Sequence, residues 1–236
     1  MPLKFMEHIL ILTHDPEGTR DWFCNNLGFV SGYHPEFGFP VYWLYIGEQD
    51  VVHIGKAKFS NHQDIKVELL KLFYEADSES SEKKFDLNPF ENITKLDWSR
   101  STDTQRKWVK YFFPHLKIKL DEIFKKMGYS QYSLEALWFQ QYEKESYHGW
   151  HVHGSNFTAV YYVELPEDSP GTEIINPPLN KKIHIDVKEG DVILFPSYVI
   201  HRGPPNMSNE RKTIISFNTS VSEIQKDTLN KIHLLS

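Results

Sequence analysis

Apolar and polar positions in the first 55 residues form a short alternation of strand-like and helix-like segments. The run Phe5–Leu12 has the apolar, β-branched character of a strand. Asp15 and Pro16 predict a helix start, because aspartate caps helices and proline fits the first turn. The helix is expected over residues 19–26, with Leu27-Gly28-Phe29 as its stop. Three strands are expected to follow, over residues 29–33, 41–46 and 50–54. The order is β-α-β-β-β.

The middle of the chain changes to a helical period. Residues 64–73 and 108–127 carry apolar side chains at helical spacing, and the second segment is expected to break at Pro114. Before it, the acidic and serine-rich stretch 75–82 is typical of a solvated loop. We therefore expect a domain boundary between Lys56 and Asn92, and place it after residue 56.

From Ser133 onward the pattern indicates strands. Short β-type runs are separated by Gly, Pro, Asn and Asp: SLEALWFQQYE, FTAVYYVEL, TEIINP, KKIHIDV, DVILFPSYVIH and KTIISFNTSV. Six such runs in under 100 residues favour a β-sandwich or jelly roll. The predicted fold is mainly β with α: a small α+β βαβββ module over 1–56, then a jelly-roll domain with flanking helices over 57–236.

Composition and charge narrow the function classes. A net charge of −6 over 236 residues argues against a nucleic-acid footprint, which requires basic excess. No window has the roughly 18 uncharged apolar residues of a membrane span, and the N-terminal apolar stretch is too short for a signal sequence. A cytoplasmic protein is expected. The single cysteine, Cys24, excludes an intramolecular disulfide, so the 12 histidines and the carboxylates must supply any metal chemistry.

The densest candidate for chemistry is the segment YHGWHVH. On a strand, His151 and His153 share a face about 6.6 Å apart, and two imidazoles on one face can bind one metal ion. His201, after the strand DVILFP, is the best candidate for a third ligand. Neutral imidazole suits iron, zinc, copper and nickel. His148 and His184 are expected to be solvated or structural.

A further pair of polar residues follows on the last strand. Arg211 suits a carboxylate, which it binds through two parallel hydrogen bonds, and Thr213 shares its face of a regular strand.

These parts, in this order, resemble the iron- and 2-oxoglutarate-dependent oxygenases, whose jelly roll is a double-stranded β-helix. The segments WHVHG, VYYVELP, EGDVILFPSYVIHRGPPN and ERKTIISFN look like the phage and marine-bacterial branch of prolyl-4-hydroxylase-like proteins, over about Asp64 to Val221. The resemblance implies that His151 and His201 bind Fe(II), while Arg211 and Thr213 hold the distal carboxylate of 2-oxoglutarate. Tyr142 is a further candidate on the 2-oxoglutarate side.

One position departs from the family pattern. His153 stands where the motif His-x-Asp/Glu has its carboxylate, and we expect it to be the third ligand because it lies on the right face. Glu145 or Asp168 filling the place is the alternative. A site of three histidines has one anionic ligand fewer, which alters the charge balance at the metal.

Residues Glu7 to Gly55 resemble a single βαβββ module of the vicinal oxygen chelate superfamily, which includes glyoxalase I and the extradiol dioxygenases. The resemblance implies that His8 and His53 occupy ligand positions. Such modules work in pairs, so a homodimer through this module is one expectation and a remnant used for packing is the other.

The leading functional hypothesis is an oxidoreductase: an Fe(II)- and 2-oxoglutarate-dependent dioxygenase that hydroxylates a small-molecule or protein substrate, releasing succinate and CO2. Two alternatives stay open: a vicinal-oxygen-chelate-type metalloenzyme, and a non-catalytic cupin-like metal-binding module.

Overall fold

The fold was examined in a computed structural model of the 236-residue chain. The described residues are 9–11, 15–32, 42–46, 49–54, 57–78, 91–176 and 181–226. The chain divides into two compact units. The first comprises residues 1–57 and 185–187, and the second comprises residues 58–184 and 188–236. The boundary expected after residue 56 lies beside the first division.

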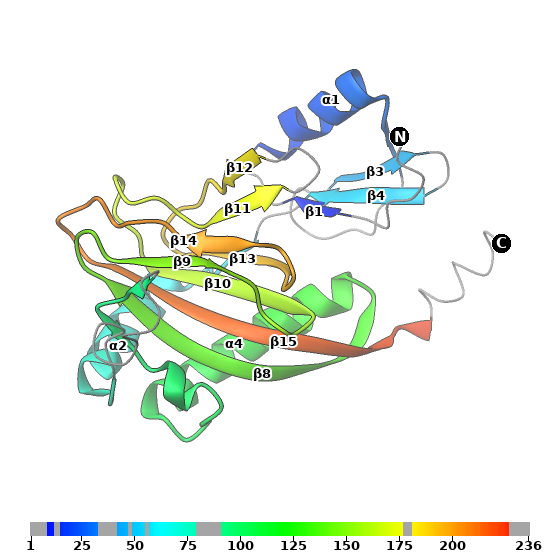
Figure 1. The fold of residues 1–236 in the computed structure, drawn as a ribbon. Coiled ribbons are helices and arrows are strands. Elements are labelled where there is room, and N and C mark those ends of the chain that lie inside the picture. The colour runs from blue at the N-terminus through cyan, green and yellow to red at the C-terminus, as the bar shows by residue number, and fades with distance from the viewer. Residues whose placement is uncertain are drawn as a thin grey trace. The chain divides into compact units, whose positions relative to one another are not determined.

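The first unit contains one helix and a four-stranded sheet (Figure 1). Its elements are β1 (Ile9–Ile11), α1 (Pro16–Leu27), β2 (Val30–Ser31), β3 (Tyr42–Ile46) and β4 (Gln49–Ile54). The sheet order is β1-β4-β3-β2, and β1 runs parallel to β4.

The ends of α1 follow the expected capping chemistry. The backbone N–H of Gly18 donates to the Asp15 carboxylate at 2.8 Å, and Pro16 is the first helical residue. Gly28 ends the helix at φ 71°, in the left-handed region that glycine adopts without a steric penalty.

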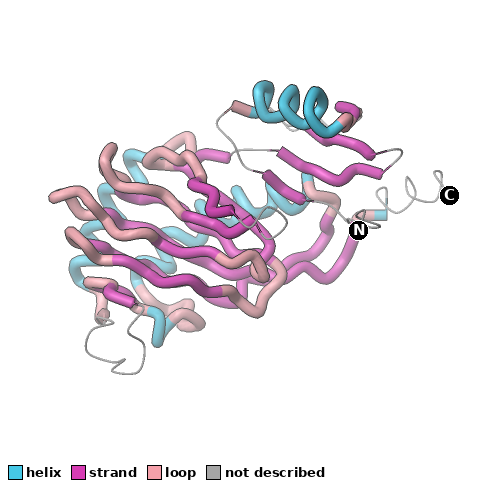
Figure 2. Tube along the Cα trace, turned by 45° about the horizontal axis from the view of Figure 1, so that its top comes forward, coloured by secondary structure: helices cyan, strands magenta, loops and turns pink. Residues whose placement is uncertain are grey.

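The second unit is built from two antiparallel sheets and two long helices (Figures 1 and 2). The larger sheet has the order β5-β13-β10-β15-β8-β7 and the smaller one has the order β12-β11-β14-β9-β6. The elements are β5 (Ala57–Lys58), α2 (His62–Glu75), β6 (Glu91–Asn92), β7 (Lys95–Leu96), the 3-10 helix η1 (Trp98–Arg100), α4 (Lys107–Lys126), β8 (Tyr129–Tyr142), β9 (Tyr147–His151), β10 (Phe157–Glu164), β11 (Glu173–Asn176), β12 (Lys181–His184), β13 (Asp191–Pro196), β14 (His201–Gly203) and β15 (Lys212–Ile224).

Helices α2 and α4 cover one face of the larger sheet with aromatic side chains. Phe73 of α2 stacks on Phe139 of β8 at a centroid distance of 4.3 Å, and Phe112 of α4 stacks on Tyr161 of β10 at 5.5 Å. All four side chains are buried. Burial of this apolar area holds the helices to the sheet.

Because side chains alternate along a strand, the neighbouring positions face the other way, toward the smaller sheet. Tyr142 of β8, Tyr162 of β10 and Lys212 of β15 line a cavity there, together with residues of β9 and β14. The helices therefore close one face of the larger sheet, and the candidate chemistry lies on the other.

Helix α4 corrects one expectation. It runs without a break from Lys107 to Lys126, with Pro114 inside it. Pro114 is exposed, so the backbone carbonyl that loses its N–H partner can bind water instead. Within the described residues, the helices are all too short or too polar to cross a membrane.

Candidate metal centre

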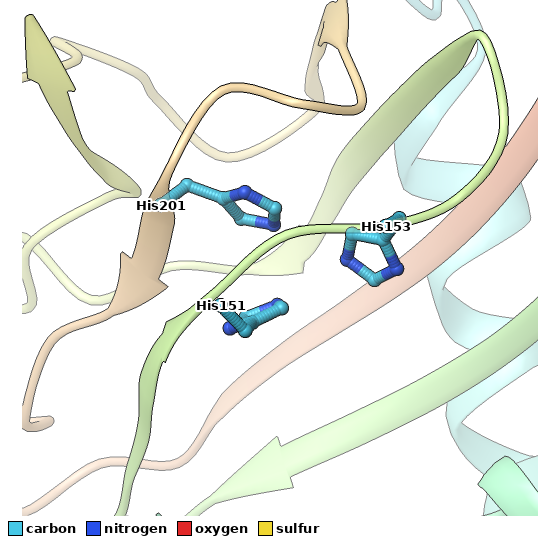
Figure 3. A group of neighbouring side chains, drawn as sticks. All are labelled: His151, His153 and His201. Atoms are coloured by element: carbon cyan, nitrogen blue, oxygen red, sulfur yellow. The ribbon is translucent and has the colours of Figure 1, made fainter. Parts of the chain in front are cut away.

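Three imidazoles converge at one end of the cavity (Figure 3). His151 ends β9, His153 follows two residues later, and His201 begins β14. The antiparallel pairing of these strands places His201 opposite His151, and their ring centroids lie 4.2 Å apart. One possible ligand atom from each histidine lies within 4.8 Å of the others. The structure thus brings together the three histidines that the sequence pattern predicted as ligands.

Backbone carbonyls fix the protonation of two of these rings. Nδ1 of His151 lies 2.7 Å from the carbonyl oxygen of Gly149, and Nδ1 of His201 lies 2.8 Å from that of Val199. A carbonyl oxygen only accepts, so Nδ1 carries the proton and donates it. The lone pair is then on Nε2 of each neutral ring, which is the arrangement found in metal-binding histidines.

His153 has a different neighbour. Its Nδ1 lies 3.4 Å from the side-chain nitrogen of Asn218, an amide donor. In a neutral ring that accepts at Nδ1, Nε2 carries the proton. Turning the Asn218 carboxamide by a half rotation offers its oxygen to Nδ1 and frees Nε2 for a metal.

Burial keeps the three rings neutral. It lowers the pKa of His151 to about 2, with the neighbouring His148 and His201 adding to the effect. Burial also lowers the pKa of His153 and of His201 to about 4. Neutral imidazole is the form that binds metal, so at neutral pH no proton has to leave before a metal binds.

His148 was expected to be solvated or structural, yet it is a fourth histidine at the cavity. Its ring stacks on that of His151, with centroids 3.9 Å apart and planes 22° apart. In a regular strand, residues three apart face opposite ways. Here the register between β9 and β14 shifts, so that three steps on β9 match two on β14. This bulge turns His148 toward the cavity, and only Gly149 hints at it in the sequence.

A lysine lies elsewhere in the cavity wall. Lys212 is 2% exposed, its Nζ donates to the carbonyl oxygen of Pro170 at 2.6 Å, and it lies 5.6 Å from the ring centroid of Tyr142. Burial lowers the pKa of Lys212 to about 7, while the charge of Glu173 opposes that shift. Tyr142, predicted on the 2-oxoglutarate side, lines the same cavity and is buried.

Arg211 and Thr213, predicted as the co-substrate clamp, lie outside the cavity. Arg211 binds both carboxylate oxygens of Glu164, at 2.9 and 3.1 Å, and Thr213 donates to the same carboxylate. This correction has a geometric reason: alternate residues of β15 face opposite sides of the sheet, and the cavity side holds Lys212, Ile214 and Ser216. The sequence shows both a lysine and an arginine here, and only the strand's register chooses between them.

The remaining sequence candidates do not join the centre. Glu145 and Asp168, the carboxylate alternatives to His153, are both exposed, and the described residues whose ligand atoms cluster here are histidines alone. His8 lies outside the described residues, as does the side chain of His53, so their predicted role as ligands stays a prediction.

Comparison with solved structures identifies proteins of the same fold. A member of the 2OG-Fe(II) oxygenase family from Burkholderia pseudomallei matches with a TM-score of 0.59 and 12% identity, covering 92% of this chain and 97% of that one. A Pseudomonas putida prolyl-4-hydroxylase matches with a TM-score of 0.52 and 11% identity over 70% of this chain and 91% of that one.

A Trichoplax adhaerens prolyl hydroxylase, solved with a hypoxia inducible factor peptide fragment, matches with a TM-score of 0.51 and 16% identity over 94% of both chains. No family model and no curated protein matches the sequence. These structural matches show that the chain has the double-stranded β-helix fold of prolyl-4-hydroxylase-like 2-oxoglutarate oxygenases; they leave the vicinal oxygen chelate resemblance of the first unit as a prediction.

Proposed function

We propose that this chain is a non-haem Fe(II)- and 2-oxoglutarate-dependent oxygenase. The observation that carries the proposal is the cluster of three neutral imidazoles, His151, His153 and His201, in a cavity that also holds a buried lysine. The fold shared with 2-oxoglutarate oxygenases supports the same reading. The donor set fits Fe(II), since imidazole is a common ligand for it.

Each part of the cavity has a role in this proposal. His151, His153 and His201 would hold the metal through Nε2. Bound Fe(II) would supply the O2 chemistry that converts 2-oxoglutarate to succinate and CO2 while the substrate is hydroxylated.

Lys212 replaces Arg211 as the proposed partner of the distal carboxylate, because its ammonium group is the buried cation of the cavity wall. Tyr142 packs beside that ammonium group and orients it. The substrate class, small molecule or protein side chain, remains a prediction from the sequence.

Anaerobic titration of the Fe(II)-loaded protein with 2-oxoglutarate tests the proposal. The expected result is a new visible absorption band, followed on exposure to O2 by release of succinate. Lys212→Met should weaken 2-oxoglutarate binding by about 30-fold or more, since it removes one partner of a buried charge pair. Arg211→Gln should change it by less than about fivefold, because its partner Glu164 lies outside the cavity.

The opposite ranking of these two variants would restore the clamp predicted from the sequence. Absence of both the band and succinate would refute the oxygenase proposal. A metal-binding module without turnover would then be favoured, for which the lack of a carboxylate in the cluster is the supporting observation.

A further inference from the structure

The charges around the cavity do not balance in the way a divalent metal site requires. Among the described residues that line it, none is an aspartate or a glutamate, while Lys212 and Arg202 are cationic. The three candidate ligands are neutral imidazoles. A divalent cation bound there would keep its full charge in a partly enclosed space.

The nearby carboxylates are already committed to other cations. Glu173 is 2% exposed and accepts from Arg202 at 2.5 Å, and it also pairs with Lys182 at 3.2 Å and with His184 at 3.0 Å. The cationic charge of Arg202 is therefore compensated.

Glu164 is taken up by Arg211 and Thr213. The ammonium of Lys212 is different, because its described hydrogen-bond partner is the neutral carbonyl oxygen of Pro170. No carboxylate of the described chain forms an ion pair with it.

A metal ion and Lys212 in one cavity repel each other, and in a site with low water content that repulsion is weakly screened. A dicarboxylate removes both problems at once. One carboxylate can bind at the metal and the other at Lys212, so the two negative charges of the ligand compensate the two uncompensated centres.

We propose that the metal and a dicarboxylate bind this cavity interdependently, each raising the affinity of the other about tenfold or more, because His153 occupies the place of an anionic ligand. The inference rests on the proposed function and adds its binding order: the dianion, rather than a protein carboxylate, completes the charge of the metal site. By linkage the factor must be the same in both directions.

The test is a pair of anaerobic calorimetric titrations of the full chain at pH 6.5, where Lys212 is mainly protonated. Co(II), which does not turn over, is titrated with and without saturating 2-oxoglutarate, and 2-oxoglutarate is titrated with and without Co(II). We expect both dissociation constants to fall by the same factor of about ten or more. 2-Oxopentanoate, which has the same length and lacks the distal carboxylate, should give a smaller factor because it leaves Lys212 uncompensated.

The variant His153→Asp tests the assigned cause. It supplies the missing anion, so Co(II) should bind more tightly than to the parent chain in the absence of 2-oxoglutarate, and the coupling factor should shrink. Asn209→Asp is the matched control: it adds the same charge at an exposed position and should change neither quantity. The parent-chain titrations decide the matter even where His153→Asp does not fold.

Equal Co(II) affinities with and without 2-oxoglutarate, within twofold, would overturn the inference. If succinate is released in the oxygenase assay, that result refutes the interdependence alone. If 2-oxoglutarate neither binds nor is consumed, the oxygenase proposal and the inference both fall.

Discussion

His153 differs from the other two histidines of the centre in what its Nδ1 contacts. His151 and His201 donate to rigid backbone carbonyls, whereas His153 faces the Asn218 carboxamide, whose two ends exchange donor and acceptor. Asn218 is itself held, since its side-chain oxygen accepts from Thr158 at 3.0 Å. The third ligand is therefore the one whose protonation depends on a single side chain.

Asn218→Leu should lower Co(II) affinity about tenfold, because a ligand histidine without its orienting partner binds metal more weakly. Asn218→Asp should restore or exceed the parent affinity, since a carboxylate only accepts and so keeps the proton on Nδ1. Titration by Co(II) absorbance measures both. Asn209→Leu, at an exposed position, is the control. Unchanged affinity in Asn218→Leu would remove Asn218 from the site.

At the scale of elements, the strands of the second unit place chemistry through alternation and its one local exception. On β15 alternation puts Lys212 in the cavity and its two neighbours outside. On β9 the bulge breaks alternation and adds His148 to the same wall. The helices contribute from the other face, where they hold the sheet in place.

Helix α2 is fixed to that sheet by a polar cluster beside its aromatic contacts. His62 is 6% exposed; its Nδ1 lies 2.7 Å from the hydroxyl of Tyr161, and its Nε2 lies 3.1 Å from the Glu189 carboxylate. Lys66 donates to the same carboxylate at 2.8 Å. This cluster ties the first turns of α2 to β10 and to the residue before Gly190.

His62→Ala should reduce the free energy of unfolding by about 1–3 kcal/mol, because it leaves Tyr161 and Glu189 without a buried partner. His115→Ala, on the half-buried side of α4, should cost less than about 0.5 kcal/mol. Urea unfolding followed by circular dichroism measures the difference. Equal losses in the two variants would show that the cluster adds no stability.

At the scale of the whole molecule, three buried neutral histidines make stability depend on acid. Their pKa values in the fold, about 2 for His151 and about 4 for His153 and His201, lie below the ordinary 6.5 that applies in the unfolded chain. Between pH 6.5 and 4 the unfolded chain binds these protons and the folded chain does not, so stability is lost as the pH falls through this window.

The metal-free chain should therefore lose up to about 1.4 kcal/mol per pH unit for each of the three histidines between pH 6.5 and 4. Replacing all three with glutamine should flatten this part of the stability profile. Replacing the exposed His184 with glutamine should leave most of the slope in place. Denaturant unfolding at half-unit pH steps measures it, and an unaltered slope in the triple variant would contradict the assignment.

Much of this architecture could be read along the chain. The capping residues of α1, the helical period of α2 and α4, and the run of β-type segments after Ser133 are local signals, and the structure contains the corresponding elements. The break expected at Pro114 is wrong because the local cost of proline is offset by an exposed position within a helix whose other face is buried.

The sequence by itself determined which ligands are available and that two of them share a face, because His-x-His spacing on a strand is a local property. Tertiary structure decided the rest. It joined His201 to the pair across two paired strands, turned His148 inward through a bulge, and chose Lys212 over Arg211 through the register of β15. Its pairing of nearby carboxylates with other cations also left the metal site without an anion. These choices depend on which strands pair and at what offset, and a shift of one residue reverses the face that every side chain presents.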